Sequence, residues 1–269
     1  MPTPLEILLD PVSLTLFAIY GTLILVEALF PARRLPRIPG WHARALAVFA
    51  AYFFLSSYLP LLWGEALAGV QLVDQQSIHP VAGTVVGVLL FEFFVYVYHR
   101  AVHTNHWLWR TCHQMHHSAE RVDTFGAFYF SPLDTVGFTF LSSLALSLVG
   151  LPPESVTWTL YVTTFLVVFQ HTNVRTPQWL GYFVQRPESH SLHHGRGVHW
   201  FNFSDLPLWD LLFGTFRNPQ DFVAENGFEG ASSAQIVPML LFRDVAAAGA
   251  AQAASARAAS ESSPARARA

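Results

Sequence analysis

Three groups of histidines are the residues of this sequence best suited to chemistry. The first is the pair His99 and His103, in the stretch H-R-A-V-H. Two copies of H-x-x-H-H follow it, at His113, His116 and His117 and at His190, His193 and His194. Residues three or four apart project from one face of a helix, because the helix turns once per 3.6 residues. The spacing therefore predicts three short helical faces that together offer eight imidazoles.

Eight imidazoles suit a pair of metal ions better than a single ion. Neutral imidazole is a common ligand of iron, zinc and copper. A catalytic zinc ion typically takes three protein ligands, so eight histidines exceed what one such ion needs. Two ions, each with about four nitrogens and an open position, would use the whole set. The pattern thus favours a two-metal centre.

The composition is that of a membrane protein. Of the 269 residues, 52% are hydrophobic and only 12% are charged, whereas a soluble domain carries about 25% charged residues. The formal net charge of −3 argues against a nucleic-acid partner. Cys112 is the single cysteine, which excludes an internal disulfide. All basic residues are arginine and the tail is rich in alanine, which favours a GC-rich bacterial genome and a bacterial inner membrane.

Five apolar stretches are candidates for membrane-spanning helices, at residues 12–30, 45–62, 81–98, 132–149 and 155–169. The first would span about 28 Å at 1.5 Å per residue, which is enough for a bilayer core. The fourth and fifth stretches are short and could instead form a re-entrant pair. We therefore predict an all-α fold with four to five transmembrane helices and a histidine-rich helical cap.

The distribution of arginines predicts the orientation in the membrane. Arg33, Arg34 and Arg37 follow the first apolar stretch, and the loop after the second stretch has no basic residue. The positive-inside rule then makes the first loop cytoplasmic, and counting spans from there puts every histidine motif on the cytoplasmic side. We expect one domain over residues 1–243. The Ala-, Arg- and Ser-rich residues 244–269 should be disordered.

Four motifs resemble those of a known family: H-R-A-V-H from His99, L-W-R-T-C-H-Q-M-H-H-S from Leu108, P-E-S-H-S-L-H-H from Pro187 and W-D-L-L-F-G-T from Trp209. They look like the fatty acid hydroxylase/sterol desaturase superfamily of integral-membrane di-iron oxygenases. The resemblance covers residues 91–216, roughly half of the chain. It implies a histidine-rich cytoplasmic cap, two iron ions on the eight motif histidines, and dioxygen-dependent hydroxylation or desaturation of a lipid.

The resemblance extends to three further residues. His171 resembles an additional isolated metal ligand, although a histidine that caps a helix end is the alternative. Glu92 lies inside the third apolar stretch, where a charge is costly and usually functional, and the family usually has Asp there. We expect Glu92 to accept a ring N–H from a ligand histidine; a protonated Glu bonded to a neighbouring helix is the alternative. Asp210 resembles another residue that orients a ligand, with a helix cap or an arginine partner as the alternative.

These observations favour a non-haem di-iron monooxygenase that hydroxylates a C–H bond of a fatty acyl or sterol-like lipid from the bilayer. The sequence contains no haem-attachment motif and no G-x-G-x-x-G loop, so we expect a separate electron donor of the ferredoxin, flavin or cytochrome type. Lipid desaturation, ether-lipid cleavage and carotenoid oxidation remain open for the same site.

Other classes of protein fit the sequence less well. A zinc-dependent membrane hydrolase would need a general base, commonly in H-E-x-x-H, and that motif does not occur. A metal transporter should carry paired charges in several spans, whereas only Glu92 lies deep in one. A membrane cytochrome would place lone histidines inside facing helices. Metal analysis would separate these classes.

Overall fold

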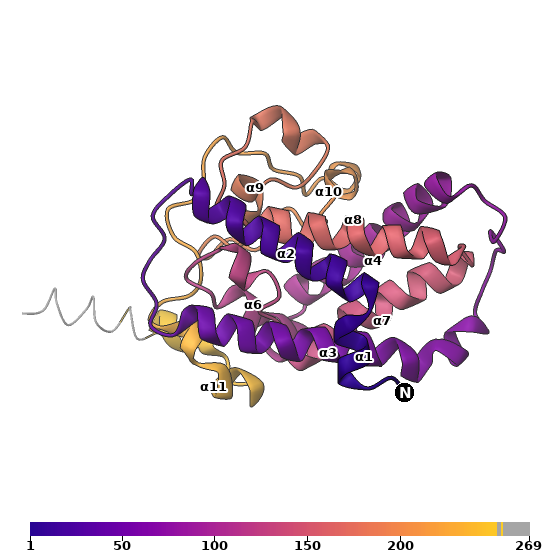
Figure 1. Ribbon diagram of the computed structural model, residues 1–269. Coiled ribbons are helices and arrows are strands. Elements are labelled where there is room, and N and C mark those ends of the chain that lie inside the picture. Colours follow the sequence, from indigo (N-terminus) through magenta and orange to yellow (C-terminus); the bar gives the residue numbers. More distant parts are fainter. Residues whose placement is uncertain (252–253, 255–269) are drawn as a thin grey trace, which may run out of the picture.

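Five long helices lie side by side and make up most of the molecule (Figure 1). The computed structural model describes residues 1–251 and 254. The long helices are α2 (Pro11–Leu29), α3 (Trp41–Ala68), α4 (Pro80–Thr104), α7 (Pro132–Val149) and α8 (Pro153–His171). In the described residues the only β-type pairing is two isolated bridges. The predicted all-α class is confirmed.

Local sequence signals explain where these helices begin and end. Proline opens α2, α4, α7 and α8, because its fixed φ suits the first turn and its missing N–H would have no partner there. The side chain of Ser131 accepts a hydrogen bond from the Asp134 N–H at the start of α7. Gly150 ends α7 with a φ of 56°, a conformation that glycine adopts without strain. Helix α3 continues through Pro60 to Ala68, beyond the end of the predicted apolar stretch at residue 62.

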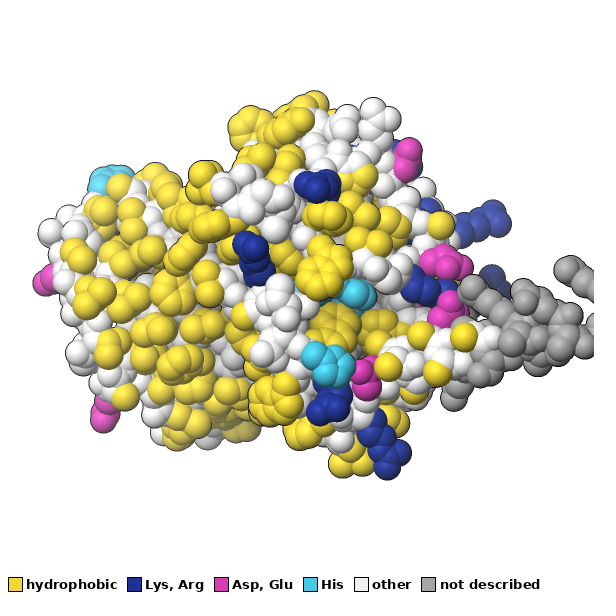
Figure 2. Space-filling view, turned by 180° about the vertical axis from the view of Figure 1, so that it is seen from behind, with side chains coloured by type: hydrophobic (Ala, Val, Ile, Leu, Met, Phe, Trp, Pro, Cys, Tyr) yellow, Lys and Arg dark blue, Asp and Glu magenta, His cyan; other side chains and the backbone are white. Residues whose placement is uncertain are grey.

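Four of the long helices, α2, α3, α4 and α7, are long and apolar enough to cross a membrane. Between 11% and 33% of their apolar windows is buried inside the molecule, so most of these side chains face outward. Hydrophobic side chains accordingly cover much of the bundle surface in Figure 2. Helix α8 has the same length as α2 but buries Ser155, Thr159 and Thr163, and it is not among the four.

The connections between the helices divide the bundle into two ends. Helix α1 (Pro4–Leu9), the α3–α4 loop and the α7–α8 turn lie at one end (Figure 1), and none of them contains an arginine. The α2–α3 loop, the chain between α4 and α7, and everything described after α8 lie at the other end. This second end, called the histidine end below, carries all the histidine motifs, as the count of spans predicted.

Short helices build a cap at the histidine end. Between α4 and α7 lie α5 (His106–Leu108), the π-helical η1 (Trp109–His113), α6 (Gln114–His117) and η2 (Thr124–Gly126). After α8 come η3 (Gln178–Tyr182), α9 (Pro187–His193), α10 (Pro207–Phe213), η4 (Ser232–Ala234) and α11 (Ile236–Leu240).

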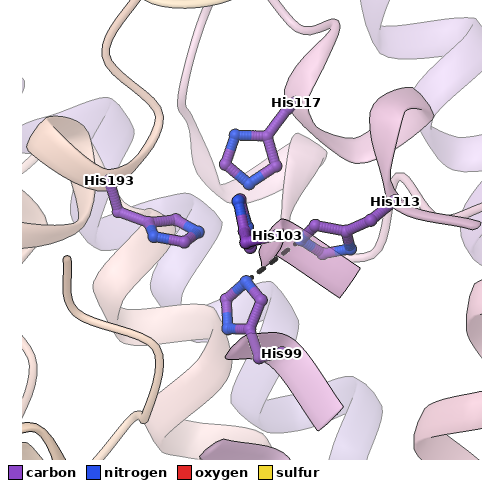
Figure 3. A group of neighbouring side chains, drawn as sticks. All are labelled: His99, His103, His113, His117 and His193. Carbon is purple, nitrogen blue, oxygen red and sulfur yellow. Dashed lines mark hydrogen bonds between the residues drawn. The ribbon is translucent and has the colours of Figure 1, made fainter. Parts of the chain in front are cut away.

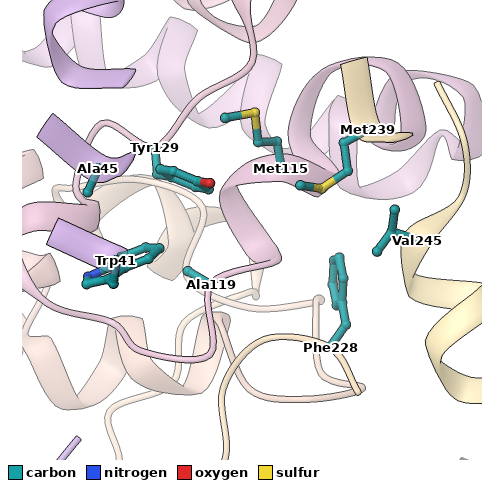
Figure 4. Close-up of a cluster of buried hydrophobic side chains, with 8 residues drawn as sticks. All are labelled: Trp41, Ala45, Met115, Ala119, Tyr129, Phe228, Met239 and Val245. Carbon is teal, nitrogen blue, oxygen red and sulfur yellow. The ribbon is translucent and has the colours of Figure 1, made fainter. Parts of the chain in front are cut away.

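A hydrophobic cluster ties this cap to α3 (Figure 4). Its members are Trp41, Ala45, Met115, Ala119, Tyr129, Phe228, Met239 and Val245. Trp41 also donates its indole N–H to the buried carboxylate of Asp123, 3.0 Å away. Because Val245 is buried here, ordered chain continues past the predicted boundary at residue 243, and residues 245–251 are helical. The rest of the predicted disordered tail lies outside the described residues, apart from residue 254.

Candidate metal centre

Nine histidines converge at the cap, and they form two groups. The five-histidine group contains His99, His103, His113, His117 and His193 (Figure 3). The four-histidine group contains His116, His171, His190 and His194. Within each group the candidate ligand nitrogens lie within 4.8 Å of one another, and all nine residues are buried. The structure thus brings together every histidine that the sequence singled out as a ligand.

Local helical geometry distributes these side chains between the groups. The last turns of α4 carry His99 and His103, and His171 is the last residue of α8. The neighbours His116 and His117 enter different groups, because adjacent residues of a helix point about 100° apart. They follow the π turn at Trp109–His113, a conformation that is frequent at functional sites.

The spacing of the ring nitrogens fits metal ions. The Nε2 atoms of His99 and His113 are 3.0 Å apart, and three Nε2–Nε2 distances in the four-histidine group are 3.0 to 3.2 Å. Two imidazoles on neighbouring octahedral positions, with bonds of about 2.1 Å, have nitrogens about 3.0 Å apart. A tetrahedral ion would hold them about 3.4 Å apart. Imidazoles at these distances can therefore share one ion.

Several ring nitrogens have no partner, which a metal ion would supply. Both nitrogens of His103 and of His117, and Nε2 of His193, are buried without a hydrogen bond among the described residues. Leaving such an atom unpaired costs about 1–3 kcal/mol. These orphaned nitrogens belong to the five-histidine group, so the donor set fits a bound ion there.

Burial keeps the histidines of the cap in the form that binds metals. Removal from water holds the pKa of His116, His117, His190, His193 and His194 well below the usual value of 6.5. The charged imidazolium is disfavoured in such surroundings. The rings are therefore neutral near pH 7, and neutral imidazole is the metal ligand.

Four rings are oriented by an acceptor at Nδ1, which leaves Nε2 free to face its group. His99 donates to the carbonyl of Phe203 at 2.7 Å, and His193 donates to the carbonyl of Phe201 at 2.8 Å. His171 donates to the Val167 carbonyl of its own helix at 2.6 Å.

The fourth of these rings, His113, has a carboxylate partner that the sequence did not predict. Its Nδ1 lies 2.6 Å from Asp134 Oδ2, and Asp134 is fully buried in the first turn of α7. The hydroxyl of Tyr98 donates to the other carboxylate oxygen at 3.1 Å. An acidic residue that opens an apolar helix after a histidine motif was the available signal, but it also fits an ordinary helix start.

Glu92 does not hydrogen-bond to a histidine ring, which corrects the contact predicted for it. Its Oε2 accepts from the hydroxyl of Ser204 at 3.1 Å and from the N–H of Asp205 at 3.0 Å. Both donors belong to the loop that follows α9. This loop lies against the α4 face of Glu92, so it reaches the carboxylate in place of a ring.

Asp210, in α10, holds the same loop from its other side. Its two carboxylate oxygens accept the backbone N–H groups of Phe203 and Ser204, each at 2.9 Å. The carbonyl of Phe203 in turn orients His99. Glu92 and Asp210 therefore act on a candidate ligand through the loop that they fix, and not by direct contact.

A cavity of about 860 Å³ opens onto both histidine groups. His99, His113, His116, His171 and His190 line one end of it. From there it follows α3 from Phe49 to Ala68 and reaches α1, which is about 28 Å at 1.5 Å per residue. Near the histidines its wall includes the aromatic side chains of Phe128, Phe130 and Phe138. The cavity suits an elongated, largely apolar molecule, and its volume lies in the range of small-molecule sites, about 300–1,000 Å³.

Comparison with known sequences gives the family of this part of the chain. Residues 84–215, which hold most of α4, the histidine motifs of the cap and α8, match the model of the family described as fatty acid hydroxylase. This stretch of the chain is therefore similar to the fatty acid hydroxylase family. The match contains all nine histidines of the two groups, together with Glu92, Asp134 and Asp210.

Several curated hydroxylases are similar to about half of this chain. Ornithine lipid hydroxylase OlsE of Rhizobium tropici is 34% identical over 140 residues, which are 50% of this chain and 42% of that protein. Sphinganine C4-monooxygenase 1 of Arabidopsis thaliana is 27% identical over 49% of this chain and 53% of its own length. Cholesterol 25-hydroxylase of Homo sapiens is 28% identical over 48% of this chain and 49% of its own length. The alignments therefore span about half of each relative. No solved structure matches the chain significantly.

Proposed function

We propose that this protein is a di-iron, dioxygen-dependent lipid hydroxylase. The observation that carries the proposal is the meeting of two buried histidine groups with a long apolar cavity among membrane helices. The names of the similar proteins, which act on ornithine lipids, sphinganine and cholesterol, support a lipid substrate and hydroxylation as the reaction.

The two groups would each hold one iron ion through the imidazoles named above. Bound iron would supply the redox chemistry by which dioxygen is reduced and an unactivated C–H bond is oxidised. The overall reaction takes one dioxygen, two electrons and two protons, gives one alcohol and one water, and inserts one oxygen atom into the C–H bond. The electrons must come from a separate donor, for which a ferredoxin-, flavin- or cytochrome-type protein is the candidate.

The protein's own part would be to hold rings and to exclude water. Asp134 and the carbonyls of Phe201 and Phe203 fix three ring orientations, and Glu92 and Asp210 fix the loop behind one of them. The aromatic wall beside the histidines keeps the reacting carbon in an apolar environment. We further propose that the histidine end faces the cytoplasm of a bacterial cell.

Metal and lipid analysis together test the proposal. Protein purified without oxygen should contain two iron ions per chain, and lipids from producing cells should gain one oxygen atom by mass spectrometry. A matched variant with His103 and His117 both changed to Ala should lose both signals. Loss of two hydrogens from the lipid, without added oxygen, would reassign the reaction to desaturation. One zinc ion per chain and lipid cleavage would favour the hydrolase and contradict the proposal.

A further inference from the structure

Two buried polar side chains stand in the cavity wall beside the four-histidine group. Gln170 is 3% exposed and directly precedes His171 in α8. Asp205 is 7% exposed and belongs to the loop held by Glu92. Both residues line the cavity together with His171 and His190. The Gln170 amide donates to Asp205 Oδ1 at 2.6 Å, so the two form one polar unit at the reacting end.

This polar unit leaves hydrogen-bond acceptors unused. Gln170 Oε1 is buried and has no partner among the described residues. The orientation of the amide follows from chemistry, because its NH₂ must face the carboxylate. The hydrogen bond from Gln170 occupies Oδ1 of Asp205, and Oδ2 receives none within the described part of the chain. A molecule in the cavity could therefore donate an O–H or N–H to either oxygen.

Two serine hydroxyl groups in the cavity wall already have partners. Ser57 and Ser143 line the cavity further from the histidines. Each donates its hydroxyl to a carbonyl of its own helix, Phe53 and Thr139 respectively, at 2.7 Å. Closer to the histidines, the aromatic wall of the cavity offers no strong acceptor. Buried groups that lack a partner are the ones that reward a matching ligand. Gln170 Oε1 is such an acceptor at the histidine end of the cavity, and Trp63 Nε1 is an unpaired donor in the α3 part of its wall.

We propose that Gln170 and Asp205 bind a hydrogen-bond-donating group of the lipid substrate, such as a hydroxyl or an amide N–H. The inference rests on the proposed hydroxylase function and deepens it. It implies that the carbon to be hydroxylated lies within a few bonds of that polar group. The apolar remainder of the lipid extends away from the histidines along α3, through the rest of the cavity.

Two probes of equal chain length test the inference, a long-chain N-alkyl amide and the corresponding n-alkane. The iron-loaded, full-length protein in lipid nanodiscs should bind the amide about tenfold more tightly than the alkane, and should hydroxylate the amide close to its N–H. Gln170→Leu should lose this preference through a higher KM for the amide, while its iron content and its affinity for the alkane stay unchanged. Binding is measured by calorimetry, so this result does not depend on turnover.

Gln185→Leu is the matched control. Gln185 is 1% exposed and its amide also lacks a side-chain partner, but it is not in the cavity lining. This variant should keep the amide preference. If Gln170→Leu does not fold or loses iron, Asp205→Asn serves as the second variant, because it keeps an acceptor for Gln170 and replaces the other acceptor with a donor. It should also weaken amide binding.

Equal binding of the two probes by the wild type, or hydroxylation at the far end of the chain, would overturn the inference. An equal loss of affinity for both probes in Gln170→Leu, with iron retained, would also overturn the inference. The side-chain amide of Gln170 would then stabilise the fold or bind a water molecule. If the iron-loaded protein binds the amide probe selectively but hydroxylates neither probe, the proposed function is contradicted. The binding site inferred at Gln170 and Asp205 would still be supported.

Discussion

Asp134 has the most direct effect of any carboxylate on a candidate ligand. Its short contact with His113 fixes which ring nitrogen carries the proton, and its second oxygen is held by Tyr98. Carboxylate partners of this kind raise the basicity of a metal-binding histidine and fix its orientation. The residue therefore matters for metal affinity although it does not belong to either histidine group.

Asp134→Leu should lower iron affinity about 10- to 100-fold, because Nδ1 of His113 loses its acceptor and the ring is free to turn. Iron per chain, measured after dialysis against a weak chelator, checks this. Asp221→Leu is the control, since Asp221 is at the same end but its side chain is 74% exposed and forms a surface ion pair with Arg175. Full iron retention in Asp134→Leu would show that the contact does not support metal binding.

Glu92 should tolerate an amide better than an apolar side chain. Its partners are donors, the Ser204 hydroxyl and the Asp205 N–H, and a glutamine oxygen can accept from both. We therefore expect Glu92→Gln to keep iron and turnover within about twofold, while Glu92→Leu frees the loop and lowers turnover about tenfold or more. Turnover and iron content are measured on both variants. A tenfold loss in Glu92→Gln would mean that the negative charge itself is required.

Single residues differ in how far the sequence predicted them. The eight motif histidines were predictable because helical periodicity within each motif is a local property, whereas the isolated His171 was predicted only from the family resemblance. Their hydrogen-bond partners were not, because Phe203 lies 104 residues from His99 and Asp134 lies 21 residues from His113. Glu92 was predicted to contact a histidine ring, because nothing in its own helix reveals the loop that crosses it.

At the scale of elements, close packing of α4 on α8 sets the distance between the two histidine groups. A side chain on Gly87 would overlap the hydroxyl of Thr159, and one on Gly83 would overlap that of Ser155. Small residues four apart allow helices in membranes to approach closely. Helix α4 carries His99 and His103, and α8 ends at His171. This packing therefore fixes the position of candidate ligands of one group relative to a candidate ligand of the other.

Gly87→Val should push α8 away from α4, lower the midpoint of thermal unfolding and reduce iron content. Overpacking of a tight contact costs about 1–3 kcal/mol. Thermal unfolding and iron analysis of the purified protein measure both effects. Gly21→Val is the matched control in α2, because nothing lies within 4 Å of its added carbon. Identical behaviour of the two variants would mean that the α4–α8 contact does not position the histidines.

Helix boundaries were predicted well where prolines and apolar stretches coincide. The fourth apolar stretch, 132–149, is the range of α7. The second, third and fifth stretches fall inside α3, α4 and α8, and the first runs one residue past the end of α2. The cap was harder, because helices of three to seven residues carry too little periodicity. Its packing around Trp41 and Val245 depends on contacts between distant segments.

At the scale of the whole molecule, charge is strongly asymmetric. All twelve arginines of the described residues lie at the histidine end or in the adjoining turns of α3 and α4. The opposite end carries acidic residues such as Asp74 and Glu154. Basic residues near spans are retained in the cytoplasm. The asymmetry is the ground for placing the metal centre on that side.

Cysteine labelling checks the orientation, because Cys112 is the single cysteine and can be replaced by alanine. In that background Asp74→Cys should react with a membrane-impermeant maleimide on intact cells, whereas Asp221→Cys should react only after permeabilisation. Both positions are exposed, at opposite ends. The reverse pattern would place the histidines outside.

The division of sequence neighbours between the two groups has a consequence for how the ions enter. His116 and His117 belong to different groups, and so do His193 and His194. An ion bound by one group therefore orders the same backbone segments that carry ligands of the other group. Stepwise addition of ferrous iron to the apo-protein should therefore give mixtures of empty and doubly loaded molecules, visible by native mass spectrometry, with few singly loaded ones. A dominant one-iron species at half saturation would show that the two ions bind independently.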